Sequence, residues 1–307
     1  MAPRHFIDIH CLPTSTLRGI IDAAHTMKRA GKSVPDNLCP EGIEDDVLVM
    51  VFEKPSTRTR ISFDVAMRQL GGQTIVLNHS DLQLGRGESV ADTARVMSRY
   101  ADAVMLRSNS HDALLEFAEN ATIPVINGLT DKSHPCQVVA DIMTFEETHG
   151  DIAGRTVAWV GDGNNVAASW IHAADRLGFE LRIACPGQLR PDRAVMNWLK
   201  QSGANVTITD EPKEAVREAD CVVTDTWVSM GQTDETYRKQ VLGPYSVDNE
   251  IMAEAADGAI FMHCLPAYRG HEVSADVIDG PRSVVFEEAE NRLHAQKAIL
   301  AWCLGGL

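Results

Sequence analysis

The densest group of chemically useful side chains lies at residues 56–60, which read Ser-Thr-Arg-Thr-Arg. The apolar run at residues 47–52 predicts a buried strand, and the apolar spacing after residue 60 predicts a helix that ends at Gly71. A helix N-terminus favours anions through its unpaired backbone N–H groups and its dipole. The hydroxyls and guanidinium groups add donors that suit phosphate oxygens, so the segment predicts an anion site. A capping Ser56 followed by two surface arginines is the alternative interpretation.

Three further reactive side chains stand at the ends of predicted strands. Arg107 ends a strand at residues 103–107, Asp225 follows residues 221–224, and Cys264 lies at the end of the strand at 259–262. The carboxyl ends of parallel strands face the ligand in open α/β sheets, so we expect these residues at a site. A turn-forming aspartate and a buried filler cysteine are the alternatives.

His134 precedes a proline that suits the first position of a helix. The helix dipole disfavours a protonated imidazole at this place, and a neutral imidazole can donate a hydrogen bond to a carbonyl oxygen. The alternative is a histidine that only caps the helix.

The rest of the chain alternates between predicted strands and helices on both sides of residue 150. The predicted strands are residues 47–52, 74–77, 103–107, 124–127, 156–160, 181–184, 206–209, 221–224 and 259–262. The predicted helices are residues 14–30, 56–70, 88–100, 111–119, a segment from 134 onward, a segment after the turn at 161–166, 191–202, 212–218 and 287–304. This pattern predicts an α/β protein with two doubly wound domains, parallel sheets and a ligand crevice between the domains.

The turn Gly161-Asp-Gly-Asn-Asn-Val166 follows a predicted strand and resembles the first turn of a dinucleotide-binding unit. Val166 replaces the third glycine of that fingerprint, so the signal for a nicotinamide cofactor is weak.

The composition and net charge of the chain argue against several classes of protein. The chain has 307 residues, 44% of them hydrophobic, and a formal net charge of -15, which argues against broad binding to nucleic acid or membrane surfaces. The seven cysteines are odd in number and contain no Cys-x-x-Cys, and His263, Cys264 and His271 do not match a zinc spacing. We therefore expect a cytoplasmic protein without disulfides or metal, with no secretory signal and no membrane span.

Taken together and in order, these motifs resemble the aspartate/ornithine carbamoyltransferase family, and within it the branch that uses ornithine. The matching segments span nearly the whole chain: Ser56-Thr-Arg-Thr-Arg60, Asp81-Leu-Gln-Leu-Gly-Arg86, Arg107, His134-Pro-Cys-Gln137, Asp162-Gly-Asn-Asn165, Asp225-Thr-Trp-Val-Ser-Met-Gly231, His263-Cys-Leu-Pro266 and Arg292.

The resemblance implies a carbamoyl phosphate domain at residues 1–149, an ornithine domain at 150–286, and a terminal helix at 287–307 that packs back on the first domain. It implies transfer of a carbamoyl group to the δ-amine of ornithine to give citrulline and phosphate, a step of arginine metabolism, with no cofactor. It also implies a homotrimer, or a multiple of it, in which Gln83 reaches a neighbouring subunit's site.

The resemblance also assigns the site residues. Those for carbamoyl phosphate are Ser56, Thr57, Arg58, Thr59, Gln83, Arg107, His134, Gln137, Cys264, Leu265 and Arg292. Those for ornithine are Asn165, Asp225, Ser229 and Met230. Cys264, His134, Arg107 and Asp225 are expected to take part in catalysis, and the role of Arg60 stays open.

Other functions remain as alternatives at this point. One is a carbamoyltransferase for aspartate, putrescine or N-acetylornithine, although a carboxylate at Asp225 favours an acceptor with a free α-ammonium group. The others are a nicotinamide dehydrogenase and a small-molecule sensor or binding protein, and the crowding of reactive side chains favours chemistry over binding alone.

Overall fold

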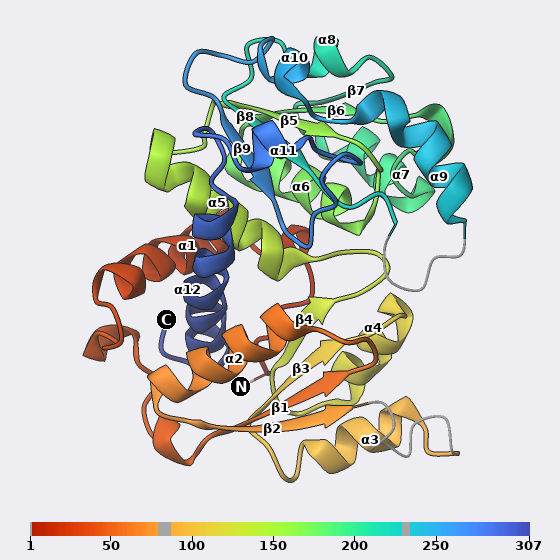
Figure 1. Cartoon of the computed structure of the whole chain (residues 1–307). Helices are drawn as coiled ribbons and strands as arrows, with labels where there is room; N and C mark the ends of the chain where they lie inside the picture. The colour runs from red at the N-terminus through yellow and green to blue at the C-terminus, as the bar shows by residue number, and fades with distance from the viewer. Residues whose placement is uncertain (1, 79–86, 229–233) are drawn as a thin grey trace. The chain divides into compact units, whose positions relative to one another are not determined.

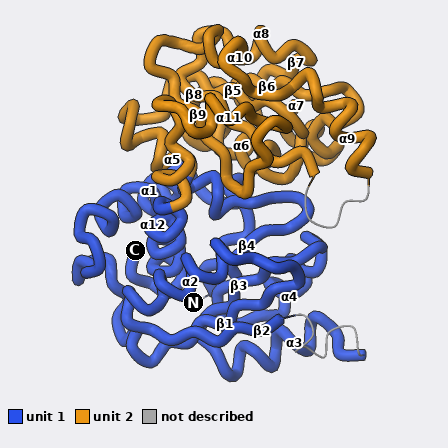
Figure 2. The backbone as a smooth tube through the Cα atoms, in the orientation of Figure 1, with its two compact units in different colours: residues 1–140, 290–307 blue, residues 141–289 orange. Residues whose placement is uncertain are grey.

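The computed structural model describes residues 2–78, 87–228 and 234–307. The chain divides into two compact units, each of which is considered by itself (Figure 2). Unit 1 consists of Met1–Ala140 and Glu290–Leu307, and unit 2 consists of Asp141–Ala289. No helix in the described ranges has the length and apolar character that a membrane crossing requires.

Unit 1 is built on a parallel sheet with the strand order β2-β1-β3-β4. Its strands are β1 (Val47–Phe52), β2 (Gln73–Asn78), β3 (Ala103–Arg107) and β4 (Val125–Leu129). β2 pairs with one edge of β1 and β3 with the other, so the direction in which strands are added reverses between β1 and β3. Such a switch point leaves the carboxyl ends of two neighbouring strands open to a ligand.

Helices cover both faces of the unit 1 sheet. Val49 and Val51 pack in one cluster with Met97 and Phe117, and the opposite face of β1 is buried as well. The helices of the unit are α1 (Thr14–Arg29), α2 (Thr57–Leu70), α3 (Val90–Met97), α4 (His111–Asn120), the first part of α5 (Pro135–His149) and the last part of α12 (Val285–Cys303). Short 3-10 turns occur at Ile9–Cys11, Asp36–Leu38 and Ile43–Asp45.

Unit 2 repeats this plan with a longer parallel sheet in the order β7-β6-β5-β8-β9. The strands are β5 (Thr156–Val160), β6 (Glu180–Ala184), β7 (Val206–Thr209), β8 (Cys221–Thr224) and β9 (Ile260–His263). β5, β6 and β7 are added in one direction and β8 and β9 in the other, so the switch point lies between β5 and β8.

Strands β5, β8 and β9 of unit 2 are buried on both faces, as in a doubly wound sheet, whereas the edge strand β7 is partly exposed. Ala158 and Val160 pack in a cluster with Val216 of α8, and Val157 and Trp159 are buried on the other face. The helices, which Figure 1 shows around the sheet, are α6 (Asn165–Leu177), α7 (Arg193–Ser202), α8 (Pro212–Val216), α9 (Glu235–Leu242), α10 (Asn249–Met252) and α11 (Ala275–Ile278). Further 3-10 turns occur at Gly187–Leu189 and Gly243–Tyr245.

The predicted fold class of two α/β domains with parallel sheets is confirmed. Strands β1, β3, β5, β7 and β8 have the predicted limits, and the other strands differ from prediction only at their ends. Helices α9, α10 and α11 are not among the predicted elements. α10 and α11 are single turns, too short to show a helical period, and α9 has few buried positions.

The division between the units falls inside helices. α5 and α12 are continuous, but the contacts of residues 141–149 and 285–289 belong to unit 2. A helix that continues through a boundary shows no glycine, proline or polar linker at that point, so the sequence alone carries no signal for it.

Candidate functional site

Two guanidinium groups converge on one hydroxyl at the switch point of unit 1. Thr59 lies in the first turn of α2, directly after β1, and is fully buried. Arg107 Nη1 donates to Thr59 Oγ1 over 3.1 Å, and Arg292 Nη2 donates to the same oxygen over 2.6 Å. Arg107 ends β3 beside Phe52, the last residue of β1, and Arg292 comes from α12. The fold thus concentrates two positive charges at the start of a helix.

His134 stands next to this group at the start of α5. Its carbonyl accepts hydrogen bonds from the backbone N–H groups of Gln137 and Val138, over 3.1 and 3.4 Å, as expected at a helix start. Burial, and then the charges of Arg292 and Arg107, hold the pKa of His134 well below its ordinary value. The imidazole is therefore neutral at physiological pH, as the sequence-based hypothesis requires.

The remaining residues of the 56–60 segment differ in their exposure. Ser56 occupies the position before α2, but its side chain makes no capping hydrogen bond to the helix, so the capping interpretation of this serine is wrong. Arg58 is partly buried, whereas Thr57 and Arg60 are exposed. Gln137, on the first turn of α5, is buried in the same unit.

Glu53 is a site-supporting residue that the sequence-based reasoning overlooked. Its carboxylate accepts hydrogen bonds from Ser108 Oγ (2.9 Å) and from the Asn109 backbone N–H (2.7 Å). It therefore ties the loop that follows β1 to the loop that follows β3. Its position directly after the β1 run was the available signal.

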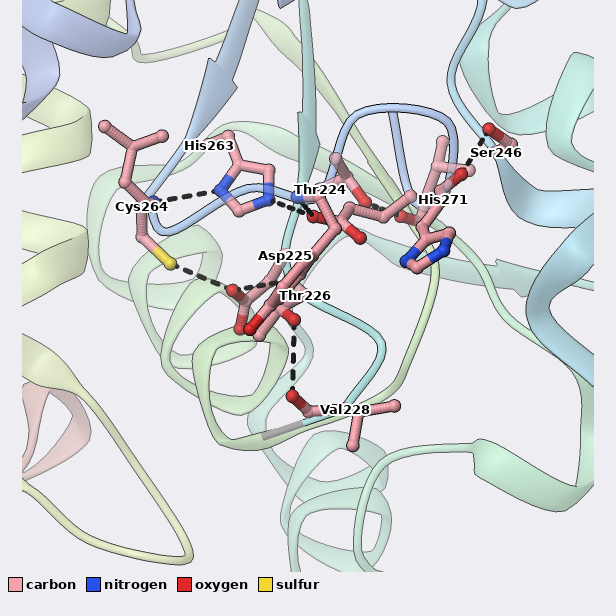
Figure 3. A network of polar contacts seen from close by, with 12 residues as sticks. Thr224, Asp225, Thr226, Val228, Ser246, His263, Cys264 and His271 are labelled. Carbon is pink, nitrogen blue, oxygen red and sulfur yellow. Dashed lines mark hydrogen bonds and ion pairs between the residues drawn. The ribbon is translucent and has the colours of Figure 1, made fainter. Parts of the chain in front are cut away.

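Asp225 is the centre of the polar cluster in unit 2. It directly follows β8 and is buried. Its Oδ1 accepts from Cys264 Sγ (3.0 Å) and from the Thr226 backbone N–H (2.7 Å), and its Oδ2 accepts from Asn164 Nδ2 (2.7 Å). Figure 3 shows the thiol of Cys264 pointing at this carboxylate. Three strand ends thereby meet at one acidic group, since these residues follow β8, β9 and β5.

The side chain of Asn164 both caps a helix and hydrogen-bonds to Asp225. This residue was not among the site residues predicted from the sequence. Its Oδ1 accepts from the backbone N–H groups of Val166 (2.9 Å) and Ala167 (3.1 Å), which caps α6, while its amide nitrogen holds Asp225. Asn165, which was predicted to bind ornithine, is the first residue of α6 and partly exposed.

Cys264 keeps its proton at neutral pH. Desolvation by the surrounding protein, and then the neighbouring Asp225 carboxylate, raise the pKa of the Cys264 thiol well above its ordinary value. The group is therefore a hydrogen-bond donor rather than a thiolate nucleophile. All seven cysteines lie in the described ranges, and none forms a disulfide.

A buried ion pair supports the turn that carries Asn164. Arg238 of α9 pairs with Asp162, and its Nε donates to the carbonyl of Trp227 over 2.6 Å. Both charged side chains are nearly inaccessible to solvent. The pair links the turn after β5 to the segment after β8, so it holds the two sides of the switch point together.

The glycine at 163 explains why the turn after β5 looks like a dinucleotide site. A Cβ there would lie 2.4 Å from the Pro191 backbone nitrogen and 2.6 Å from the Leu189 carbonyl oxygen. The chain's own backbone makes the close approach that a pyrophosphate makes in a dinucleotide-binding turn. This glycine is therefore accounted for without a nicotinamide cofactor.

Asp225, His263 and Cys264 are close enough to be considered as metal ligands, since their ligand atoms lie within 4.8 Å of one another. His263 is poorly suited to that role. Its Nδ1 accepts from the Leu265 backbone N–H over 2.9 Å, and its Nε2 lies 3.2 Å from Glu272 Oε1. Both ring nitrogens are thus engaged within the protein.

The structure brings Thr59, Arg107, His134 and Arg292 together in unit 1, and Asp225, Cys264 and Leu265 in unit 2. Gln83, Ser229 and Met230, also predicted from the sequence, lie outside the described residues.

Comparisons with known proteins agree over the whole chain. Residues 4–147 match the model of the aspartate/ornithine carbamoyltransferase carbamoyl-P binding domain, and residues 153–303 match the Asp/Orn binding domain of the same family.

Individual proteins are similar at high identity. A protein of Rhodopseudomonas palustris (strain ATCC BAA-98 / CGA009) named ornithine carbamoyltransferase is 61% identical over 305 residues, which cover 99% of this chain and 98% of that protein. The solved structure of ornithine carbamoyltransferase from Pyrococcus furiosus has a TM-score of 0.92 at 46% identity and covers 100% of this chain and 98% of that one. The ornithine carbamoyltransferase of Burkholderia thailandensis has a TM-score of 0.89 at 43% identity, with 99% of each chain covered. The chain therefore belongs to the aspartate/ornithine carbamoyltransferase family.

Proposed function

We propose that this enzyme transfers the carbamoyl group of carbamoyl phosphate to the δ-amine of L-ornithine, giving L-citrulline and phosphate. Family membership and the ornithine carbamoyltransferase names of relatives at about 60% identity support the reaction class and the acceptor. The structural observation that carries the proposal is the convergence of Arg107 and Arg292 on Thr59 at a helix start, beside a neutral His134.

The phosphate end of carbamoyl phosphate would lie at the N-terminus of α2. Ser56, Thr57 and Arg58 contribute hydroxyl and guanidinium donors there, in addition to the helix dipole. Phosphate is the leaving group, so donors that favour the dianion also favour breakage of its bond to the carbamoyl carbon. This local charge is needed because the net charge of -15 repels an anionic substrate.

The carbamoyl oxygen would face Thr59, Arg107 and His134. Thr59 Oγ1 accepts from two guanidinium groups, so its remaining hydrogen-bonding capacity is the donor O–H. The neutral imidazole of His134 also offers an N–H. These groups would stabilise the charge that develops on the oxygen during attack, where one such donor is worth roughly 3 kcal/mol. Gln137 and Arg292 would complete this half of the site.

Ornithine would be held in unit 2 by Asp225 and Asn165, together with Ser229 and Met230. The Asp225 carboxylate suits a free ammonium group, which ornithine has and N-acetylornithine lacks at the α-position. Cys264 and Leu265 would line the reacting centre.

The attacking amine must lose a proton, since an alkyl ammonium group has a pKa near 10. The sequence-based hypothesis shares this task between Asp225 and Cys264. A thiol with a raised pKa remains protonated, so it is a poor base at neutral pH. We therefore propose that Cys264 orients Asp225 and the substrate as a donor, and that the carboxylate is the proton acceptor of the pair.

A homotrimer, or a multiple of it, in which Gln83 serves a neighbouring subunit, is the assembly that we propose. A cytoplasmic location is proposed because seven cysteines without a disulfide suit a reducing compartment.

The experiment that tests the acceptor is a panel assayed for ureido product at saturating carbamoyl phosphate. L-Ornithine is expected to have a kcat/KM at least about 100-fold above that of N-acetylornithine, putrescine or L-aspartate. N-acetylornithine has no second ammonium group for Asp225, and L-aspartate has none once its single amine attacks. Putrescine keeps an ammonium partner for Asp225 but lacks the α-carboxylate of ornithine. A higher kcat/KM for any other acceptor would reject ornithine as the substrate.

A further inference from the structure

A fully buried pair of titratable side chains, His263 and Glu272, lies beside Cys264 and has no part in the chemistry proposed above. His263 is the last residue of β9, directly before Cys264. Both side chains are inaccessible to solvent, with exposed fractions of 0% and 1%. Buried groups of this kind cost free energy unless the protein uses their hydrogen bonds, so their partners are informative.

The hydrogen bonds of His263 fix the position of its proton. The backbone N–H of Leu265 donates to Nδ1 over 2.9 Å, and an N–H donor requires a lone pair on that nitrogen. The proton of the neutral ring therefore lies on Nε2, which is 3.2 Å from Glu272 Oε1. The imidazole thus accepts on the side of the Cys264 turn and donates on the side of Glu272.

The same pair holds both ends of the segment that follows Cys264. Glu272 Oε1 also accepts from the Tyr268 backbone N–H over 2.6 Å, so the segment from Leu265 to Tyr268 is tied at its first and last residues. Leu265 has a φ of 56°, in the left-handed region that a residue other than glycine seldom adopts. The hydrogen bond to Nδ1 compensates for this backbone strain, which neighbouring structure must sustain.

The turn held in this way determines where the thiol points. Cys264 lies between His263 and Leu265, and its Sγ donates to Asp225 Oδ1 over 3.0 Å. Figure 3 shows His263 and Cys264 side by side, with the thiol directed at Asp225. A rotation of the Leu265 peptide would change the backbone on which Cys264 stands and so move the thiol away from the carboxylate.

We propose that Glu272 and His263 are positioning residues, which hold the Cys264–Leu265 turn through a single tautomer of the imidazole so that the thiol meets Asp225. This inference rests on the proposed function, because it assigns the pair to the acceptor half of that reaction. Neither residue touches the reacting atoms. The Glu272 carboxylate accepts from Nε2 and so keeps the proton of the His263 ring on that nitrogen. Nδ1 therefore carries the lone pair that accepts from the Leu265 backbone N–H.

Two substitutions of His263 separate the proposed contact from packing. An asparagine places its amide oxygen near the position of Nδ1 and can still accept from Leu265, whereas a glutamine reaches toward Nε2 and cannot. His263→Gln is expected to lower kcat at least about tenfold with less than about a twofold change in the KM for carbamoyl phosphate, and His263→Asn should retain most of kcat. Glu272→Gln, which keeps an acceptor oxygen, should likewise retain more of kcat than Glu272→Ala.

The matched control is Tyr245→Phe. It removes a partly buried hydrogen bond of the same unit, from Tyr245 Oη to the Asp210 carbonyl over 2.9 Å, and is expected to lower stability without lowering kcat. Thermal unfolding of every variant is measured alongside the kinetics. Equal loss of kcat in His263→Asn and His263→Gln, or an unchanged kcat in His263→Gln, would overturn the proposal.

A second measurement reads the tautomer directly. In ¹⁵N-histidine-labelled protein, His263 should show a pyridine-type shift at Nδ1 and a pyrrole-type shift at Nε2. The reverse pattern, or two pyrrole-type nitrogens, would contradict the inference. Citrulline formation by the wild-type enzyme is measured first. Its absence would reject the proposed function and this inference together, whereas a failure of the inference alone appears only in the variants and the spectrum.

Discussion

At the scale of single residues, two positively charged side chains are brought together because both hydrogen-bond to the same uncharged hydroxyl group. Arg107 and Arg292 both donate to the hydroxyl of Thr59, which spaces the two like charges while keeping both beside one helix start. In unit 2, Asp225 is surrounded by three donors in the same manner. Each reactive group is thus fixed before substrate arrives, which is the condition for electrostatic catalysis.

Replacement of Cys264 tests its role as a donor. Cys264→Ala is expected to lower kcat about tenfold or more, with a smaller effect on the KM for carbamoyl phosphate, because Asp225 loses a partner on the acceptor side. Cys264→Ser, whose hydroxyl can donate to the same oxygen, should retain more activity. Cys221→Ala, at a buried position of β8, is the control and should keep the wild-type kcat. An unchanged kcat in Cys264→Ala would make the cysteine a filler.

The neutral state of His134 makes a prediction about pH. The pKa of His134 in the folded protein lies well below the unfolded value of about 6.5. Below that pH the unfolded chain binds a proton that the folded chain refuses, so stability falls as the pH falls. The wild-type free energy of unfolding should decline by up to about 1.4 kcal/mol per pH unit more steeply than that of His134→Asn.

This prediction is checked by urea unfolding at a series of pH values from about 7.5 down to 5. Above the unfolded pKa the two proteins should have parallel pH profiles, which serves as the internal control. Parallel profiles below that pH as well would show that His134 is protonated in the fold.

At the scale of elements, both sheets place their reactive residues at a switch point. In unit 1, Thr59 lies on the first turn of the helix that follows β1, and Arg107 is the last residue of β3. In unit 2, Asn164 lies in the turn after β5, and Asp225 directly follows β8. The strands were predictable because continuous apolar runs mark parallel strands buried on both faces. The residues that follow these strands were predicted to lie at a site because the carboxyl ends of parallel strands face the ligand.

The supporting contacts of Asn164 and Arg238, unlike the position of Glu53, could not be predicted from the sequence. Asn164 and Asn165 are adjacent and identical in type, and only the helix geometry shows that Asn164 caps α6 and bonds Asp225. Arg238 lies far along the chain from its partner Asp162, on a helix with too few apolar positions to be predicted. Long-range polar pairs of this kind carry no periodicity, so spacing does not disclose them.

Loss of Arg238 should destabilise unit 2. Arg238→Ala leaves the buried Asp162 without its cation, which is expected to cost about 3–5 kcal/mol in the free energy of unfolding. The double variant Asp162→Asn with Arg238→Met should recover part of that loss, since no buried charge remains. Lys239→Ala breaks an exposed ion pair on the same helix and serves as the control, with little expected change.

Chemical denaturation of the four proteins measures these differences. A loss in Arg238→Ala no larger than that in Lys239→Ala would mean that the pair contributes nothing to the turn after β5.

At the scale of the whole molecule, two doubly wound units are covalently joined through continuous helices. α5 leaves unit 1 and α12 returns to it, and within unit 1 the last part of α12 supplies Arg292 to Thr59 and Lys297 to Gln69. The two-unit plan could be predicted from the restart of the strand–helix pattern near residue 150. The residues at which one unit ends and the other begins could not be predicted, because they lie inside α5 and α12, where the helical sequence pattern continues without a break.

One measurement tests the central claim most directly. The purified protein is mixed with ¹³C-labelled carbamoyl phosphate and L-ornithine, and the label is followed by NMR together with released phosphate. The proposed function predicts that the label moves to the ureido carbon of citrulline, with one phosphate released for each citrulline formed. The proposed function would be contradicted if the label appeared only in the spontaneous breakdown products of carbamoyl phosphate while ornithine stayed unchanged.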